Sequence, residues 1–152
     1  MTVVVRYGFK QHFAVSADMA YLWCTDFDPK DHVLIGQTNA KREVTYLTKD
    51  TLILNDTIQA ENGEAKKKKM VQCYPDQRRW VSTHLSGPNK YSQYIYEILA
   101  EKDNSTLEFT ANHLEYQKLS GKATEQLSEK LCKHDLDIWT LLAKAMEKEL
   151  NQ

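Results

Sequence analysis

The segment YIYEILAEKDNSTLEFTANH, residues 94–113, predicts two β-strands joined by a tight turn at Asp103 and Asn104. A turn at that point sets Tyr94 opposite His113 across the hairpin. Because side chains alternate between the faces of a strand, one face is apolar near the turn and polar-aromatic away from it. We expect this face to point inward. Its members are Tyr94, Tyr96, Ile98, Ala100, Leu107, Phe109, Ala111 and His113.

A strand and a short helix begin the chain. Residues 3–15 alternate between apolar and polar side chains, which indicates a long strand with one buried face. Ser16 is placed to cap a helix over residues 17–24, because its side chain can accept a hydrogen bond from the first turn. The stripe of this helix that we expect to be buried consists of Met19, Leu22 and Trp23.

A second short helix and a run of strands follow. Pro29 favours a helix start and Gly36 a helix stop, so residues 30–35 predict a helix. From residue 41 the composition is rich in β-formers, and turn formers such as Pro75 and Gly87 divide it. This predicts an antiparallel meander of six strands within residues 41–48, 51–60, 67–74, 78–86, 91–101 and 105–117.

The last segment has the period of a helix. Apolar residues recur on one stripe between Ser120 and about Leu150, which predicts one long amphipathic helix. The helix can bury this stripe only against the inward face of the sheet, so Trp139 or Ile138 should contact residues such as Phe109. The stripe consists of Leu127, Leu131, Ile138, Leu142 and Ala145, widened by Trp139 and Met146.

Composition bounds the class of protein. The chain has 152 residues, 41% hydrophobic and 27% charged, which suits one globular domain over residues 1–152 and is too apolar for intrinsic disorder. A net charge of -1 gives no reason to expect nucleic acid as a partner. Three scattered cysteines argue against a disulfide framework or a zinc knuckle, and no apolar run suggests a signal peptide or membrane anchor. We therefore expect a cytoplasmic protein without membrane insertion.

The order of these elements resembles the helix-grip fold of the START/Bet v 1-like (SRPBCC) superfamily, in its polyketide cyclase/dehydrase-like or Hsp90-activator-like branch. FAVSADMAYLWCTDFD, residues 13–28, is similar to the strand-to-helix entry of that family, and YEILAEKDNSTLEF, residues 96–109, to its penultimate hairpin. The resemblance covers nearly the whole chain. It implies an α+β fold in which a curved seven-stranded antiparallel sheet wraps a long C-terminal helix, with two short helices between strands 1 and 2 and a cavity between sheet and helix.

The inward face of the hairpin supplies the candidate ligand-binding residues. Tyr94, Tyr96 and His113 have apolar bodies and polar tips that can orient a ligand. Four apolar side chains then enclose it: Ile98, Leu107 and Phe109 of the hairpin, and Ile138 of the last helix. The alternative is that the inward Tyr and His are core residues, whose polar atoms bond to backbone groups or buried water.

Known motifs of other chemistries do not occur. The chain lacks HExxH, CxxC, GxSxG, a Walker loop and a dinucleotide fingerprint, so we expect neither a metal site nor a bound cofactor. His113, His84 or Glu97 could supply a general acid or base, but no catalytic residue is assigned. The lysine run at residues 66–69 is expected to be a solvated strand edge rather than a nucleic-acid site.

These observations favour a binding protein for a hydrophobic or amphipathic small molecule, either a monomer or a weak homodimer. One alternative is a polyketide cyclase/dehydrase-type enzyme that uses the same cavity. A second alternative is an Hsp90-activator-like protein-interaction module. A binding protein needs a cavity with a polar end, an enzyme also needs a titratable group within reach of the ligand, and an interaction module predicts a filled core with an exposed apolar patch.

Overall fold

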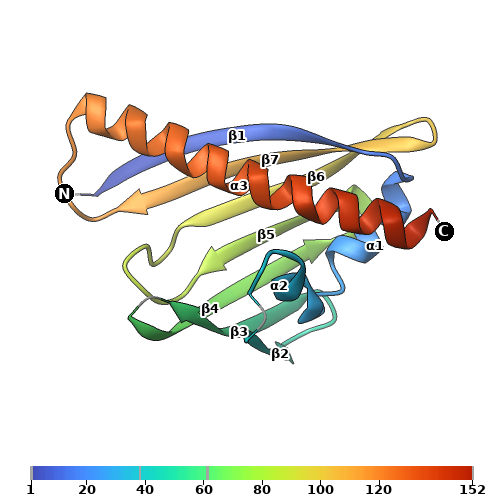
Figure 1. Cartoon of the computed structure of the whole chain (residues 1–152), viewed down its shortest axis with the longest axis horizontal. Coiled ribbons are helices and arrows are strands. Elements are labelled where there is room, and N and C mark those ends of the chain that lie inside the picture. The colour runs from blue at the N-terminus through green and yellow to red at the C-terminus, as the bar shows by residue number, and fades with distance from the viewer. Residues whose placement is uncertain (1, 38, 61, 152) are drawn as a thin grey trace.

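The computed structural model describes residues 2–37, 39–60 and 62–151. The strands form one antiparallel seven-stranded sheet in the order β1-β7-β6-β5-β4-β3-β2, so the first and last strands are neighbours. The predicted α+β helix-grip architecture is confirmed (Figure 1). The elements are β1 (Val3–Phe13), α1 (Ala17–Cys24), α2 (Lys30–Leu34), β2 (Lys41–Tyr46), β3 (Thr51–Ala60), β4 (Gly63–Tyr74), a 3-10 turn η1 (Pro75–Gln77), β5 (Arg79–His84), β6 (Gln93–Glu101), β7 (Asn104–Glu115) and α3 (Gly121–Leu150).

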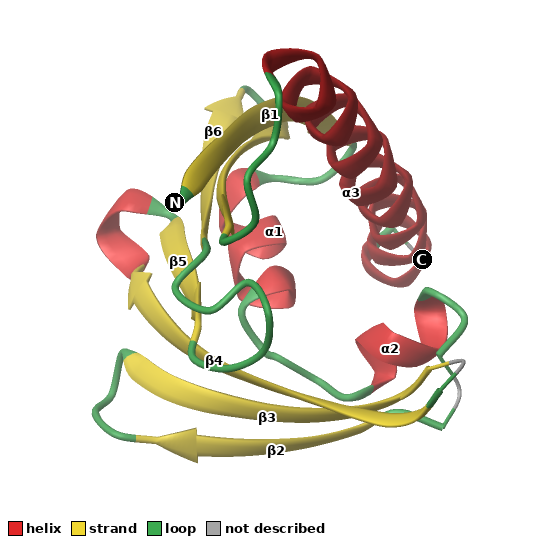
Figure 2. Cartoon of the chain, turned by 90° about the vertical axis from the view of Figure 1, so that its left-hand side faces the viewer, coloured by secondary structure: helices red, strands yellow, loops and turns green. Residues whose placement is uncertain are grey.

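The sheet curves around a hollow that helices cover. Figure 2 shows β1 and β6 on one side of the molecule, β2 and β3 on another, and α3 across the open side near β1. The helix α2 lies over the inner face of the β2–β3 end, and α1 lies deep in the bend. No described helix is long and apolar enough to cross a membrane.

The predicted starts of the two longest helices, α1 and α3, are confirmed. The Ser16 hydroxyl accepts a hydrogen bond from the Met19 amide at 3.3 Å, and the Ser120 hydroxyl accepts one from the Ala123 amide at 3.1 Å. Each contact satisfies one of the amide groups that a helix leaves without an internal partner in its first turn. The polar capping residues therefore fix where α1 and α3 begin.

The buried face of α1 differs from the predicted stripe. Met19 and Leu22 are exposed, at 45% and 71%, and only Trp23 of the predicted stripe is buried. The helix instead packs through Ala17 and Ala20, whose small side chains let its backbone lie close to the sheet. Tyr21, Trp23 and Cys24 complete the buried face.

The register of the β6–β7 hairpin also differs from the prediction, by two residues. The turn lies at Lys102 and Asp103, with Lys102 in the left-handed region at φ 54°. Tyr94 therefore faces Ala111 and not His113, while Tyr96 faces Phe109. This register joins two aromatic rings at 5.2 Å, whereas the predicted one pairs Tyr96 with alanine. A shift of two keeps every side chain on its predicted face.

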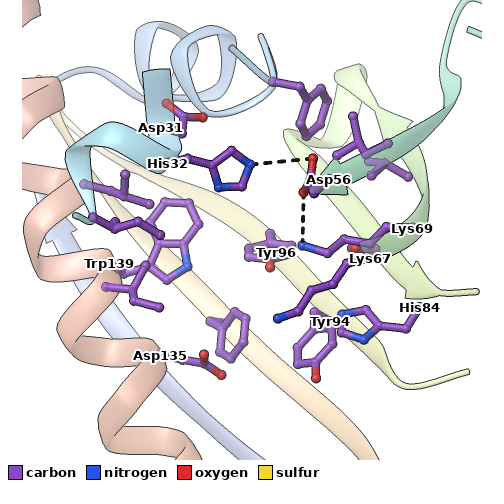
Figure 3. A pocket seen from close by; sticks show the side chains of 18 of the residues that line it. Asp31, His32, Asp56, Lys67, Lys69, His84, Tyr94, Tyr96, Asp135 and Trp139 are labelled. Carbon is purple, nitrogen blue, oxygen red and sulfur yellow. Dashed lines mark ion pairs between the residues drawn. The ribbon is translucent and has the colours of Figure 1, made fainter. Parts of the chain in front are cut away.

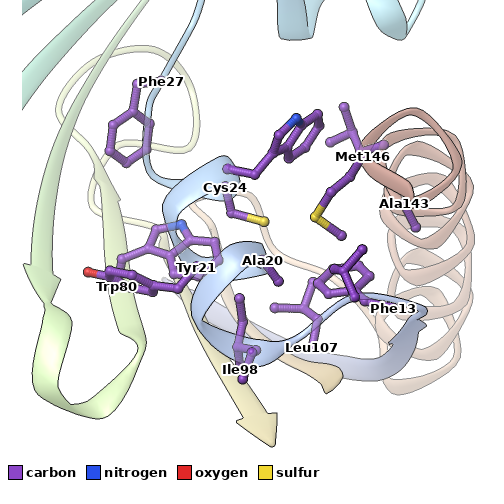
Figure 4. Packing of buried hydrophobic residues seen from close by; sticks show 14 of the residues in the cluster. Phe13, Ala20, Tyr21, Cys24, Phe27, Trp80, Ile98, Leu107, Ala143 and Met146 are labelled. Atoms are coloured by element: carbon purple, nitrogen blue, oxygen red, sulfur yellow. The ribbon is translucent and has the colours of Figure 1, made fainter. Parts of the chain in front are cut away.

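A closed hydrophobic core fills one end of the molecule (Figure 4). Phe13, Ile98 and Leu107 from the sheet meet Met146 of α3 there, and all four are at most 1% exposed. Farther along α3, the Trp139 ring lies 6.3 Å from that of Phe13 and 5.7 Å from that of Tyr96, between ring centroids. The long helix thus turns its apolar stripe toward the inner face of the sheet, as predicted.

We predict that Met146→Ala lowers the free energy of unfolding by about 2 to 5 kcal/mol, because it leaves a cavity in a closed core. Leu141→Ala on the same helix is the matched control, since Leu141 is 49% exposed and should lose less than about 1 kcal/mol. Urea titrations followed by circular dichroism measure both variants. Equal losses in the two would contradict the assigned phase of α3.

Candidate functional site

A cavity of about 450 Å³ lies between the inner face of the sheet, α2 and α3 (Figure 3). Its size falls in the range of small-molecule sites. Lys67 lines the cavity and is solvent-exposed, so the cavity reaches the surface at β4. Most of the wall is apolar or aromatic, with Phe27, Leu54, Val71, Trp80, Phe109 and Trp139 among its members.

The sequence-predicted site residues divide between the cavity and the core. Ile98 and Leu107 are 1% and 0% exposed, belong to the closed core, and are not among the described residues that line the cavity. The others lie in the cavity wall: Tyr94, Tyr96, Phe109, His113 and Ile138. Whether those five bind a ligand stays a prediction.

Three tyrosines supply neutral hydroxyl groups to the wall. Burial raises the pKa of Tyr94 to about 12 and raises the pKa values of Tyr7 and Tyr96 further above the ordinary one. The Tyr7 hydroxyl donates a hydrogen bond of 2.5 Å to Oδ2 of Asp135 on α3. Burial also raises the pKa of Asp135, although the bond from Tyr7 favours its ionised form.

His113 has partners of its own at the end of β7. Its Nε2 lies 2.7 Å from Oε1 of Glu115 and 3.2 Å from Nδ2 of Asn89. The Asn89 amide also donates to the carbonyl oxygen of Leu114 at 3.1 Å, which ties the loop before β6 to β7. His113 Nδ1 is buried and has no hydrogen-bond partner among the described residues. These contacts are those of a structural histidine on one side of the ring, while its other nitrogen is unoccupied.

A charged cluster that the sequence reading missed stands on the β2–β4 wall. Asp56 is 2% exposed and accepts two hydrogen bonds from Arg42, at 2.6 Å from Nε and 2.8 Å from Nη2. His32 Nε2 lies 3.6 Å from Oδ1 and Lys69 Nζ 3.8 Å from Oδ2 of the same carboxylate. Burial by itself would raise the pKa of Asp56, but the Arg42 and His32 contacts outweigh it and hold the pKa well below its usual range.

The lysine run lies where β4 extends past the end of β5, so the predicted solvated edge is present at Lys66 and Lys67, whereas Lys69 pairs with His84. β4 lies between β3 and β5, and alternate residues of the run point to opposite faces of the sheet. Lys66 and Lys68 are exposed on the outer face, whereas Lys67 and Lys69 line the cavity. Burial lowers the pKa of Lys69 to about 8, although the nearby Asp56 opposes this.

Of the other candidate acid or base groups, His84 lies in the cavity wall and Glu97 does not. His84 lines the cavity with its ring centroid 4.9 Å from that of Tyr94. Burial, assisted by the charges of Lys69 and Lys67, lowers the His84 pKa to about 4, so its imidazole is neutral at physiological pH. Glu97 is not among the described lining residues. Within the described ranges, no group of three His, Cys, Asp or Glu side chains could hold a metal ion.

A signal for the charged cluster was present in the sequence. In β3 the inward positions read Leu52, Leu54, Asp56 and Ile58, so a carboxylate interrupts an apolar face. A buried carboxylate requires a cationic partner, and the basic residues nearby are Arg42 and the lysine run. The strand pairing that joins them was not deducible from local pattern.

Comparisons with known proteins identify the fold. No protein-family model and no curated protein matches the chain. Among solved structures, the Zhui aromatase/cyclase from Streptomyces sp. R1128 matches with a TM-score of 0.76 and 10% identity, over 99% of this chain and 96% of the other. Norcoclaurine synthase from Thalictrum flavum, in complex with dopamine and hydroxybenzaldehyde, has a TM-score of 0.72 and 14% identity, over 98% and 87%. Ara h 8.0201 has a TM-score of 0.69 and 8% identity, over 96% and 99%. The START/Bet v 1-like helix-grip fold expected from the sequence is confirmed.

We predict that Lys69→Met raises the free energy of unfolding by about 1 to 3 kcal/mol near neutral pH, because a half-buried and poorly compensated charge is removed. The Lys69 pKa is near 8 in the folded state and near 10.5 in the unfolded chain. Below about pH 8 the folded protein therefore bears the full destabilisation that comes from holding a charged ammonium at this position. Between these values the folded protein has released a proton that the unfolded chain retains, and wild-type stability should rise relative to Lys69→Met. The advantage of the variant should therefore vanish near about pH 10.5.

Urea titrations of both proteins at about pH 7 and pH 10 measure this difference. Asp56, Arg42, His84 and Lys67, which face Lys69 from the neighbouring strands and from β4 itself, remain in both proteins. Lys68→Met, on the exposed face of β4, should change stability little at either pH. A Lys69→Met protein less stable than wild type at neutral pH would contradict the proposed balance of charges.

We predict that His113→Leu lowers the free energy of unfolding by about 1 to 3 kcal/mol, because the half-buried Glu115 and Asn89 both lose their contact with Nε2 and keep only their bond to each other and that of Asn89 to the Leu114 carbonyl. His12→Leu is the control, since His12 is exposed on the outer face of β1. Thermal unfolding measures both. If His113→Leu melted as the wild type does, the structural role would be refuted and the ligand-orienting role favoured.

Proposed function

We propose that the protein binds a hydrophobic or amphipathic small molecule in the cavity between its sheet and α3. The observation that carries the proposal is a cavity of about 450 Å³ whose wall combines aromatic rings with convergent polar groups. Small-molecule sites combine these properties: apolar walls supply affinity, and a few polar atoms fix orientation. The expectation of a cytoplasmic monomer or weak homodimer, without a nucleic-acid partner, belongs to the same proposal.

The aromatic wall suits a flat ring system. The Trp80 and Tyr96 rings are stacked, with centroids 4.7 Å apart and an interplanar angle of 1°. Tyr94 and Trp139 continue the wall on either side, and Figure 3 shows both facing the same space. Aromatic side chains favour offset-stacked or edge-to-face contacts with other rings, so a planar ligand gains more here than an aliphatic chain of equal size. The norcoclaurine synthase structure, of the same fold, contains two small aromatic molecules.

An enzyme of the polyketide cyclase/dehydrase type is a second candidate. Asp135 and Tyr7 favour it, because a carboxylate with a raised pKa and a hydroxyl that donates to it both line the cavity. Such a pair can hold or move a proton next to a bound molecule. Conversion of a bound ligand, followed by mass spectrometry, separates this candidate from simple binding.

An interaction module like the Hsp90 activators is less well supported. An interaction module binds its partner through its outer surface, so this function predicts a filled core. The cavity beside Trp139 and Tyr96 is instead large enough for a ligand. We therefore place the binding protein first, the enzyme second and the interaction module third.

We predict that Ser82→Phe weakens binding of the neutral fluorescent probe N-phenyl-1-naphthylamine at least about tenfold. Ser82 lines the cavity opposite Tyr94, so a phenyl ring there occupies the space that the probe needs. Thr83→Phe is the matched control, because Thr83 follows on the same strand and points to the other face. Probe fluorescence titrated against each folded protein gives the dissociation constants.

Two outcomes would overturn the proposal. One is a wild-type protein that does not bind the probe at all. The other is a Ser82→Phe variant that binds it as tightly as Thr83→Phe does, which would place the probe outside the cavity.

A further inference from the structure

We propose that the natural ligand carries a carboxylate that Lys69 and Lys67 bind at the β4 wall, and that it is therefore an amphipathic aromatic acid. This inference rests on the proposed function and names the chemical class of the ligand. It requires that the wall have unbalanced positive charge, that the charge face the cavity, and that an apolar body fit beside it.

The charges on this wall do not balance. Arg42 is paired with Asp56 through both carboxylate oxygens, at 2.6 and 2.8 Å, so these two charges cancel. Each oxygen of Asp56 thus already accepts a hydrogen bond from Arg42. Lys69 Nζ is 3.8 Å from Oδ2 of Asp56, which is beyond hydrogen-bond distance. Lys67 has no ion-pair partner among the described residues. One half-buried ammonium, that of Lys69, and one at the cavity mouth, that of Lys67, thus lack a full counter-charge.

Two other carboxylates line the cavity, but neither is within ion-pair distance of Lys67 or Lys69 among the described residues, although the charge of Asp135 favours the ionised form of Lys69. Asp135 stands on α3 and accepts the hydrogen bond from Tyr7. Asp31 stands on α2, where burial and the neighbouring Asp26 raise its pKa to about 6. His84, directly opposite Lys69 on β5, is neutral and adds no negative charge. A carboxylate has two oxygens, so a single such group can accept from both ammonium groups.

The lysine amines face the place where a ligand body can lie. Figure 3 shows the amines of Lys67 and Lys69 projecting into the space bounded by Tyr94, Tyr96 and Trp139. An anion held there leaves the rest of the molecule against aromatic rings. Ammonium groups bind an anion as point charges, without the planar fork of an arginine, so they accept acids of varied orientation.

The test compares two competitors that differ only in charge. N-phenyl-1-naphthylamine is bound first, and 2-naphthoate or 2-naphthamide is added to displace it near neutral pH. We expect wild-type protein to bind the naphthoate about tenfold more tightly than the amide. In Lys69→Met the preference should fall to about twofold or less. Lys69→Gln is a second variant that keeps a polar side chain and should lose the preference as well.

Lys68→Met is the control, because it removes a charge from the same strand on the exposed face and should keep the wild-type preference. Equal displacement by naphthoate and naphthamide in wild type, with the probe bound, would overturn the carboxylate inference and leave the binding function standing. A preference that survives in Lys69→Met and in Lys67→Met/Lys69→Met would overturn the assignment to these lysines. Absence of probe binding would remove the binding function, and the inference with it.

Discussion

The pairing of the first strand with the last determines where everything else can lie. β1 and β7 are hydrogen-bonded from Val3 opposite Glu115 to Phe13 opposite Ser105. The helix that follows β7 returns over β1 and is fastened to it along its length, through contacts such as Ser128 with the Arg6 carbonyl and Asp135 with Tyr7. Because α3 is held at this edge of a curved sheet, it does not cover the middle strands. The cavity is the space that remains, and the short helix α2 lies over its far side.

Local chemistry was enough to predict the elements and their order, and not enough to predict their exact pairing. Alternation placed the inner face of the hairpin correctly even though the turn falls at Lys102 rather than Asp103. A tight turn can shift by one residue along the chain when neighbouring residues all tolerate it, and each such shift moves the pairing by two. The position of the turn therefore depends on side-chain contacts across the hairpin, such as that of Tyr96 with Phe109, and the turn residues by themselves do not reveal these contacts.

The candidate site was harder to predict than the fold because its polar members come from strands that local pattern does not join. Tyr94, Tyr96 and His113 were found because they share one hairpin. Asp56 and Lys69 were missed because their meeting depends on the pairing of β3 with β4. In α1, too, burial followed the close approach of Ala20 to the sheet rather than the size of Met19 and Leu22. Hydrophobic pattern predicts which face is buried only when packing geometry does not compete with it.

The alternating lysines of β4 have a consequence for how this protein can change. Successive residues of this strand point alternately to the outer surface of the sheet and to the cavity, so neighbouring positions in the sequence determine the charge of the surface and the charge of the interior. A charge exchanged at 66 or 68 alters hydration and colloidal behaviour at the outer surface of the sheet. The same exchange at 67 or 69 alters the electric potential inside the cavity. Drift in surface character and divergence of the interior can therefore proceed independently within four consecutive positions.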